Sequence, residues 1–234
     1  MLSIIVPSYN EEDNIGKTVR DLKELDLDES YEVIVVDDGS DDRTAGNAEE
    51  AGADQVLSYD PNRGKGYAMR KGVESSQGEK ILFMDADQHE VIKIPKFIER
   101  LEKGKVIIGN RNPDRMPWTR RINNFFANLA IILATGRTMK DPVCGMRAIY
   151  KEDLLELDLA KDGFEVESEI NIKSLDTGMD VGFVPVNIDY PPQPFRFNTL
   201  GFKKSFKLAS YLSKSVIISW LDSLGILTDD KFSN

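Results

Sequence analysis

The stretch Ile81-Leu82-Phe83-Met84-Asp85-Ala86-Asp87 combines a strand with a pair of acidic side chains. A short, uninterrupted apolar run is typical of a strand buried on both faces of a parallel sheet. Two carboxylates one residue apart at the end of such a strand can together hold a hard divalent cation. Mg²⁺ or Mn²⁺ bound in this way usually bridges substrate phosphates. The alternative interpretation is a solvated acidic turn.

Apolar runs of the same kind recur on both sides of this stretch. They predict strands over Leu2–Val6, Val33–Val36, Gln55–Ser58, Ile81–Met84 and Val106–Gly109. Between them, apolar residues at helical spacing predict helices over Asn14–Leu27, Thr44–Ala51, Gly66–Ser76 and Lys96–Glu102. This alternation predicts an α/β fold with a mostly parallel sheet flanked by helices. In such sheets, ligands bind in the crevice at the carboxyl ends of the strands.

Two other predicted strands also end in residues that can bind a ligand. The first is followed by Pro7, Tyr9 and Glu11, and the second by Asp37 and Asp38. A carboxylate at the second end can accept hydrogen bonds from a nucleotide base or a ribose. The same run can instead form a strand-to-helix turn, with Asp42 capping the helix.

The segment Asn62-Arg63-Gly64-Lys65-Gly66 resembles a glycine-rich phosphate loop. It lacks the Walker A spacing, and it does not follow the first strand as a dinucleotide-binding fingerprint would. Taken alone, a loop with two glycines is more typical of a plain turn.

The charge of the chain is distributed unevenly. The formal net charge is −10, which argues against general binding to nucleic acid, because a phosphate backbone would be repelled. Residues 103–151, however, carry 10 basic and 2 acidic side chains, and residues 190–221 carry 5 basic and none acidic. Any anion-binding role is therefore expected in these two segments.

Both basic segments contain a predicted amphipathic helix. Arg120-Arg121 precede an apolar-rich helix over Ile122–Leu133, and Gly201–Leu224 combines lysines with aromatic and aliphatic residues. Further helices are expected over Glu152–Leu157 and Glu165–Leu175, and a strand over Val181–Tyr190. The two amphipathic helices are interpreted as interfacial helices on an anionic membrane. The alternative is packing on the domain or in a dimer.

Bulk features restrict the location. Cys144 is the single cysteine, so the chain has no internal disulfide and no sign of an oxidising compartment. The N-terminus reads as a strand and not as a signal peptide. No apolar stretch reaches the roughly 18 residues of a spanning helix. We therefore expect a cytoplasmic protein, attached peripherally to the cytoplasmic face of the membrane.

The strand-end clusters occur together in a fixed order, which is more specific than any single motif. The order runs Val6-Pro7-Ser8-Tyr9-Asn10-Glu11-Glu12, Val35-Val36-Asp37-Asp38-Gly39-Ser40, Asn62–Gly66, Asp85–Asp87, Gly109-Asn110-Arg111, Asp141–Arg147 and Gly163–Glu167. This series resembles the family 2 glycosyltransferases, of GT-A fold. Within that family it is most similar to the dolichyl-phosphate mannose synthase group of polyprenyl-phosphate sugar transferases.

The resemblance implies two domains and a role for individual residues. Residues 1–200 would form the GT-A glycosyltransferase domain, with an acceptor or interface helix at about 119–135, and residues 201–234 an amphipathic helix and tail. The nucleotide base and ribose would lie against Pro7, Tyr9, Glu11, Val36 and Asp38. Asp85 and Asp87 would hold Mg²⁺ or Mn²⁺, and Ala86 would line the nucleotide.

Basic residues are assigned to the phosphates in the same way. Arg111 would bind phosphate on both the donor and the acceptor, and Arg120 and Asn124 would hold the acceptor phosphate with it. Asn124 replaces the serine of this group, but its amide can still donate to a phosphate. Gln88 or His89 would be a further metal ligand, because the run after Asp87 is one residue shorter than in the synthases. Arg196 would be a second donor-phosphate arginine.

The implied reaction is metal-dependent transfer of a hexose from a nucleotide sugar (GDP-mannose or a UDP-sugar) to a polyprenyl or dolichyl phosphate. The acceptor is already an anion, so it can attack in line and invert the anomeric carbon without a strong base. Asp87, Arg111 and Arg120 would be the catalytic residues. One alternative is transfer to a glycan or lipid hydroxyl, which needs a base such as Glu165 or Glu167. Another is a non-catalytic, membrane-associated protein that binds nucleotide sugars.

Overall fold

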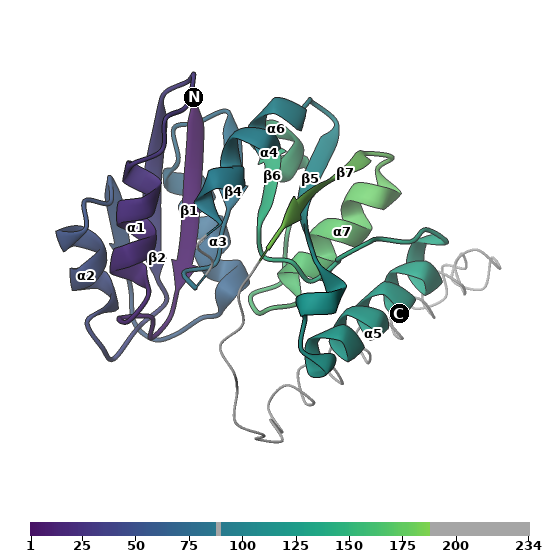
Figure 1. Ribbon diagram of the computed structural model, residues 1–234, viewed down its shortest axis with the longest axis horizontal. Helices are drawn as coiled ribbons and strands as arrows, with labels where there is room; N and C mark the ends of the chain where they lie inside the picture. The colour runs from purple at the N-terminus through teal and green to yellow at the C-terminus, as the bar shows by residue number, and fades with distance from the viewer. Residues whose placement is uncertain (88–89, 188–234) are drawn as a thin grey trace, which may run out of the picture.

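A mixed sheet forms the centre of the computed structural model, which describes residues 1–87 and 90–187 (Figure 1). The described strands lie in the order β3-β2-β1-β4-β6-β5-β7. Their bounds are β1 Leu2–Ser8, β2 Tyr31–Asp37, β3 Gln55–Ser58, β4 Lys80–Phe83, β5 Lys105–Arg111, β6 Arg147–Tyr150 and β7 Asp180–Val186. Only β6 runs against its neighbours β4 and β5, and the other described pairings are parallel.

Helices connect the strands and cover the sheet. They are α1 Ile15–Lys23, α2 Thr44–Glu50, α3 Lys65–Ser75, α4 Ile94–Arg100, α5 Trp118–Thr135, α6 Lys151–Glu156 and α7 Val166–Asp176, with single 3₁₀ turns at Val91–Lys93 and Pro113–Arg115. Across the sheet, the connection from β1 to β2 moves toward β3, whereas the connection from β3 to β4 moves in the opposite direction. Right-handed crossovers then place α1 and α3 on opposite faces of the sheet, as Figure 1 shows.

The core follows from the apolar runs in the sequence. Ile4, Ile5 and Val6 of β1 are fully buried, as are the four residues 33–36 of β2. Helix α1 buries Ile15, Val19 and Leu22, which recur at helical spacing and so lie on one face. This core holds the carboxyl ends of the parallel strands in a fixed arrangement.

The predicted elements are confirmed within the described residues, with ends that shift by up to four residues. Helix α5 is longer than Ile122–Leu133, because Pro117 allows it to begin at Trp118 and Gly136, with a φ of 69°, ends it. The short strand β6 was not predicted, and it is the strand that makes the sheet mixed. Three predicted features lie outside the described residues: the end of the strand that was predicted to reach Tyr190, the side chain of Arg196, and the helix Gly201–Leu224.

Helix α5 is the longest described helix, yet it is too polar to cross a bilayer. Neither it nor any other helix in the described part of the chain combines the length and hydropathy of a membrane span.

Candidate active site

The carboxyl ends of β1, β2, β4 and β5 lie at one edge of the sheet, and the predicted site residues follow these ends. The backbone ties the ends together: Asp38 N donates to Ser8 O at 2.8 Å, and Met84 N donates to Ile5 O at 3.1 Å. The Thr18 hydroxyl of α1 donates to the carbonyl oxygen of Ala86 at 2.6 Å. Helix α1 therefore fixes the turn that carries Asp85 and Asp87.

Three carboxylates influence one another electrostatically at this edge: Glu11, Asp85 and Asp87. Burial raises the pKa of Glu11, and the negative charges of Asp87 and Asp85 raise it further, although Asn14 donates a stabilising hydrogen bond. Desolvation by the surrounding protein and the charge of Asp85 likewise raise the pKa of Asp87, although this residue keeps part of its surface exposed to solvent. These carboxylates repel one another, so a cation placed among them would be stabilised.

Lys65 supplies part of that positive charge. Its ammonium group is in contact with Asp85 and lies 2.7 Å from Glu167 Oε1 on α7. Burial alone would lower the pKa of Lys65 and raise that of Asp85. The two carboxylates nevertheless raise the pKa of Lys65, and Lys65, with Arg147 and Arg111 behind it, lowers that of Asp85. Asp85 is thus held ionised and oriented, whereas Asp87 is exposed.

Asp38 has a structural task as well as its predicted place at the end of β2. Its carboxylate accepts hydrogen bonds from Arg63 N and Gly64 N, both at 2.8 Å, and from the Tyr59 hydroxyl at 2.9 Å. Gly66 N and Tyr67 N donate to Asp162 O at 2.6 and 3.2 Å. These backbone amides already have protein acceptors, so the glycine-rich segment acts as a turn that positions Lys65 and not as an open phosphate cradle.

Arg111 ends β5 in a buried ion pair. It is 4% exposed, and its Nε and Nη2 donate to the two carboxylate oxygens of Asp141, both at 2.7 Å. This bidentate pair fixes the guanidinium group at the edge of the sheet. Arg111 therefore contributes a fixed positive charge near Asp85, from behind the surface of the site.

Arg147 is a second buried arginine that sequence reasoning missed. It begins β6, is fully buried, and donates to Glu167 O, Asn171 Oδ1 and Cys144 O. Its partners are neutral oxygens of α7 and of the loop before β6, which it holds together. A Cβ atom at position 145 would overlap the Asp85 carboxylate, so any residue other than glycine there would require this carboxylate to move.

Helix α5 brings the two predicted acceptor residues to the same edge. Arg120 is exposed, and its charge acts to lower the pKa of Asp87. Asn124 lies one turn further along the helix, and its Oδ1 is buried without a hydrogen-bond partner in the described part of the chain. The structure thus places Arg120 within electrostatic reach of Asp87.

The remaining predicted residues differ in accessibility. Tyr9 is 46% exposed beyond β1, Ala86 is 3% exposed, and Val36 is fully buried, so the side chain of Val36 faces the core. Gln88 and His89, the alternatives for a further metal ligand, lie outside the described residues. Residues 1–87 and 90–187 contain no group of three or more potential metal ligands. Two carboxylates plus substrate phosphates and waters still fit the way Mg²⁺ usually binds.

Sequence reasoning noted Lys65 only as part of the segment Asn62–Gly66, which resembles a phosphate loop or forms a plain turn, and gave its side chain no role of its own. Glu167 was considered as a base, but its burial and its ion pair with Lys65 show it as a buried counter-charge. Glu165, at the start of α7, is only partly buried. No spacing rule marks Arg147, because its partners come from distant segments.

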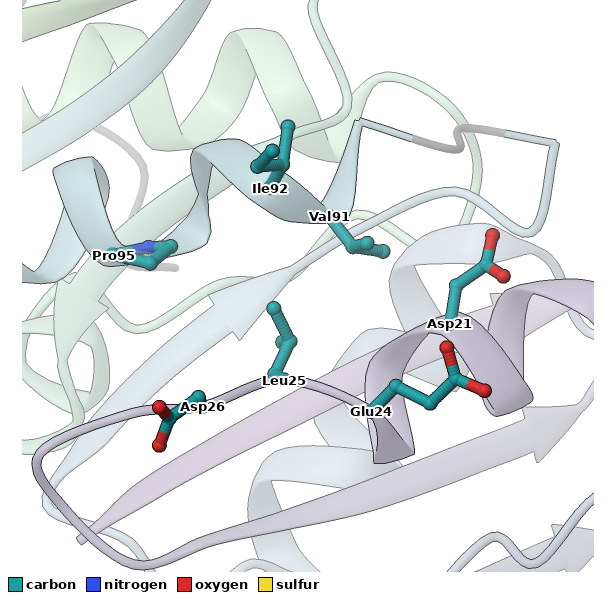
Figure 2. A pocket seen from close by; sticks show the side chains of 7 residues that line it. All are labelled: Asp21, Glu24, Leu25, Asp26, Val91, Ile92 and Pro95. Atoms are coloured by element: carbon teal, nitrogen blue, oxygen red, sulfur yellow. The ribbon is translucent and has the colours of Figure 1, made fainter.

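A separate hollow of about 370 Å³ lies between α1 and the segment Val91–Pro95 (Figure 2). It is lined by Asp21, Glu24, Leu25, Asp26, Val91, Ile92 and Pro95. None of the predicted site residues lines it, so the strand-end edge remains the candidate site.

Comparison with known proteins identifies the family. The model of Glycosyl transferase family 2 matches residues 3–157. The chain is 34% identical to glycosyltransferase AglJ of Haloferax volcanii, over 82% of this chain and 63% of that protein. It is 33% identical to the dolichol-phosphate mannosyltransferase of Pyrococcus furiosus, over 74% of this chain and 52% of that protein. It thus spans about half to two thirds of these two relatives.

The fold is also found in solved structures. The glucosyl-3-phosphoglycerate synthase of Mycobacterium tuberculosis in complex with UDP superposes with a TM-score of 0.70. The match has 22% identity and covers 92% of this chain and 80% of that one. The architecture is the GT-A fold, as the order of motifs predicted. The chain belongs to glycosyl transferase family 2.

Proposed function

We propose that this glycosyltransferase moves a hexose from a nucleotide sugar to a polyprenyl phosphate and inverts the anomeric carbon. The observation that supports this most directly is the combination of carboxylates at the strand-end edge with the amphipathic helix α5, whose Arg120 acts electrostatically on Asp87. The carboxylates belong to the strand-end edge, and Arg120 belongs to an amphipathic helix. A donor diphosphate and an anionic lipid acceptor would meet between them.

The carboxylates fit a divalent cation on the donor side. Asp87 is exposed and Asp85 is oriented by Lys65, while Glu11 adds a third negative charge. Bound there, Mg²⁺ or Mn²⁺ would neutralise charge on the leaving nucleoside diphosphate. Structures of the M. tuberculosis synthase contain Mn²⁺ or Mg²⁺ together with UDP. Pro7, Tyr9, Glu11, Val36, Asp38 and Ala86 would surround the nucleotide, Val36 through its backbone.

The arginines would act on the phosphates. Arg120 and Asn124 would hold the acceptor phosphate near the anomeric carbon, which lowers the entropic cost of reaction. Arg111, fixed by Asp141, would contribute positive charge as the leaving group departs. A phosphate acceptor needs no base. In the alternative, a hydroxyl acceptor, Glu165 would be the base, because Glu167 is buried against Lys65.

Helix α5 would bring the enzyme to its lipid acceptor. Its apolar side chains are exposed along one face: Trp118 57%, Ile122 44%, Phe125 64%, Phe126 53%, Leu129 39%, Ile132 37% and Leu133 63%. Arg121 borders this face, whereas helical spacing places Arg120 on the opposite side of α5, in line with the buried Ala127 and Ile131. Such a helix suits the interface of an anionic membrane. We propose peripheral attachment at the cytoplasmic face, where a water-soluble donor is available.

A donor screen tests this function. GDP-mannose, UDP-glucose and UDP-N-acetylglucosamine are each incubated with a short polyprenyl phosphate and Mg²⁺, and lipid-linked sugar is measured. One donor should give product on the phosphate. Product on a glycan acceptor and none on the phosphate would refute the acceptor, and donor binding without release of nucleoside diphosphate would refute catalysis.

A further inference from the structure

We propose that Phe164 determines sugar specificity by forming the platform on which the donor hexose stacks. The inference rests on the function proposed above and assigns a residue that the motif series left without a role. Phe164 precedes Glu165, which occupies the N-cap position of α7, and is 55% exposed. The Lys65 ammonium group lies 5.8 Å from its ring centroid. The ring is therefore next to the Lys65–Asp85–Glu167 cluster.

The backbone around Phe164 is fixed on both sides. Before it, Asp162 O accepts hydrogen bonds from Gly66 N and Tyr67 N of α3. After it, Glu165 O accepts from Glu169 N at 2.9 Å, within the first turn of α7. The backbone that carries the exposed ring is thus anchored to both α3 and α7. A platform that is ordered before the ligand arrives avoids part of the entropic cost of binding.

The chemistry of the ring favours a sugar over a phosphate. An aromatic face carries partial negative charge, so it attracts C–H groups and cations and disfavours anions. The axial C–H groups of a hexose form such an apolar, weakly positive face. The pyrophosphate and the acceptor phosphate are anions and would lie against the cation site and the arginines instead.

The position of the Phe164 ring also suits contact with the hexose, which is the group that the enzyme would transfer. Its anchor on α3 belongs to the half of the sheet with β1, β2 and β4, where the nucleotide is proposed to bind. Its anchor on α7 belongs to the half that packs against α5, where the acceptor is proposed to bind. A hexose passing from one to the other must lie at this boundary.

A pair of binding measurements tests the assignment. Affinities for GDP-mannose and UDP-glucose are compared with those for GDP and UDP, all with Mg²⁺, in wild-type protein and in Phe164→Ala. The variant should bind the nucleotide sugar that wild type prefers about tenfold more weakly, because stacking is lost. Its affinity for the matching nucleoside diphosphate should not change. Phe164→Trp should restore sugar binding.

The control is Leu155→Ala, which removes an apolar side chain that is 61% exposed on α6. It should leave all affinities unchanged. Equal weakening of the nucleotide sugar and its diphosphate in Phe164→Ala would overturn the assignment, as would a change confined to the KM for polyprenyl phosphate. If wild-type protein binds none of the three nucleotide sugars of the donor screen, the proposed function itself fails. If wild-type protein turns over substrate and the Phe164→Ala variant binds the nucleotide sugar as tightly as wild type does, only the role of Phe164 is refuted.

Discussion

Lys65 connects the glycine-rich turn to the chemistry of the site. Its ammonium group neutralises two carboxylates that are largely withdrawn from water, and the side-chain exposures are 11% for Lys65, 29% for Asp85 and 10% for Glu167. Replacing one partner of such a group leaves uncompensated buried charge, which costs more than the pair itself contributes.

Lys65→Met should therefore lower the free energy of unfolding by about 3 kcal/mol, measured by urea denaturation at neutral pH. Lys71→Met is the matched control, because Lys71 pairs with Glu74 at the surface and should change stability little. Equal effects of the two substitutions would show that the Lys65 cluster does not stabilise the fold.

Replacing Asp87 should lower activity but, unlike replacing Lys65, should not lower the stability of the fold. Asp87→Asn should reduce turnover by at least about a hundredfold, because a group that stabilises the leaving charge is lost. With chelator present, the variant should be slightly more stable than wild type at neutral pH. Burial and Asp85 raise the pKa of Asp87, so its ionised form is disfavoured in the folded protein.

The sign of this effect fixes its pH dependence. The destabilisation by Asp87 exists above its raised pKa and disappears as the pH falls through that pKa, so the variants should converge in acid. Thermal unfolding at several pH values measures this. Undiminished turnover in Asp87→Asn with chelator present would contradict the metal-dependent mechanism.

At the scale of elements, the loop before β6 packs against Asp85 at Gly145 and so determines where the Asp85 carboxylate can lie. Gly145→Ala should place a Cβ atom against the Asp85 carboxylate, displace it and cost about 1–3 kcal/mol by overpacking. Activity should fall in parallel. Gly46→Ala in α2, where a Cβ meets nothing within 4 Å, should be neutral or stabilising by up to about 1 kcal/mol. A fully active Gly145→Ala enzyme would show that Asp85 tolerates displacement.

The same elements show what sequence could and could not predict. The parallel strands and their helices were predictable because short apolar runs and helical periodicity are local signals. β6 becomes a strand through pairing with β4 and β5, which no local pattern shows. Asp38 and Arg111 were found as strand-end residues. Their partners, Arg63 and Gly64 for one and Asp141 for the other, depend on tertiary contacts.

At the scale of the whole molecule, the net charge of −10 conceals two regions with different tasks. The first half carries the carboxylates that repel one another at the sheet edge. The basic segment 103–151 contains α5, whose apolar face would contact the membrane. The charge asymmetry is thus consistent with a donor side and a lipid side that meet at Asp87 and Arg120.

The exposed face of α5 makes this arrangement testable. Replacing both Phe125 and Leu133 with Glu should weaken binding to phosphatidylglycerol vesicles by at least about a hundredfold in sedimentation, because two apolar side chains lose their burial in lipid. Ile92→Glu, at a site 75% exposed elsewhere on the protein, is the control. Unchanged vesicle binding in the double variant would assign membrane contact to another surface.

The central claim is metal-dependent transfer of a hexose to a lipid phosphate. The most direct test supplies one radiolabelled donor to wild-type protein with either a polyprenyl phosphate or the matching polyprenol, each with Mg²⁺ and with chelator. We predict lipid-linked sugar only on the phosphate and only with Mg²⁺. Equal product on the polyprenol, or undiminished product on the phosphate with chelator present, would contradict the mechanism.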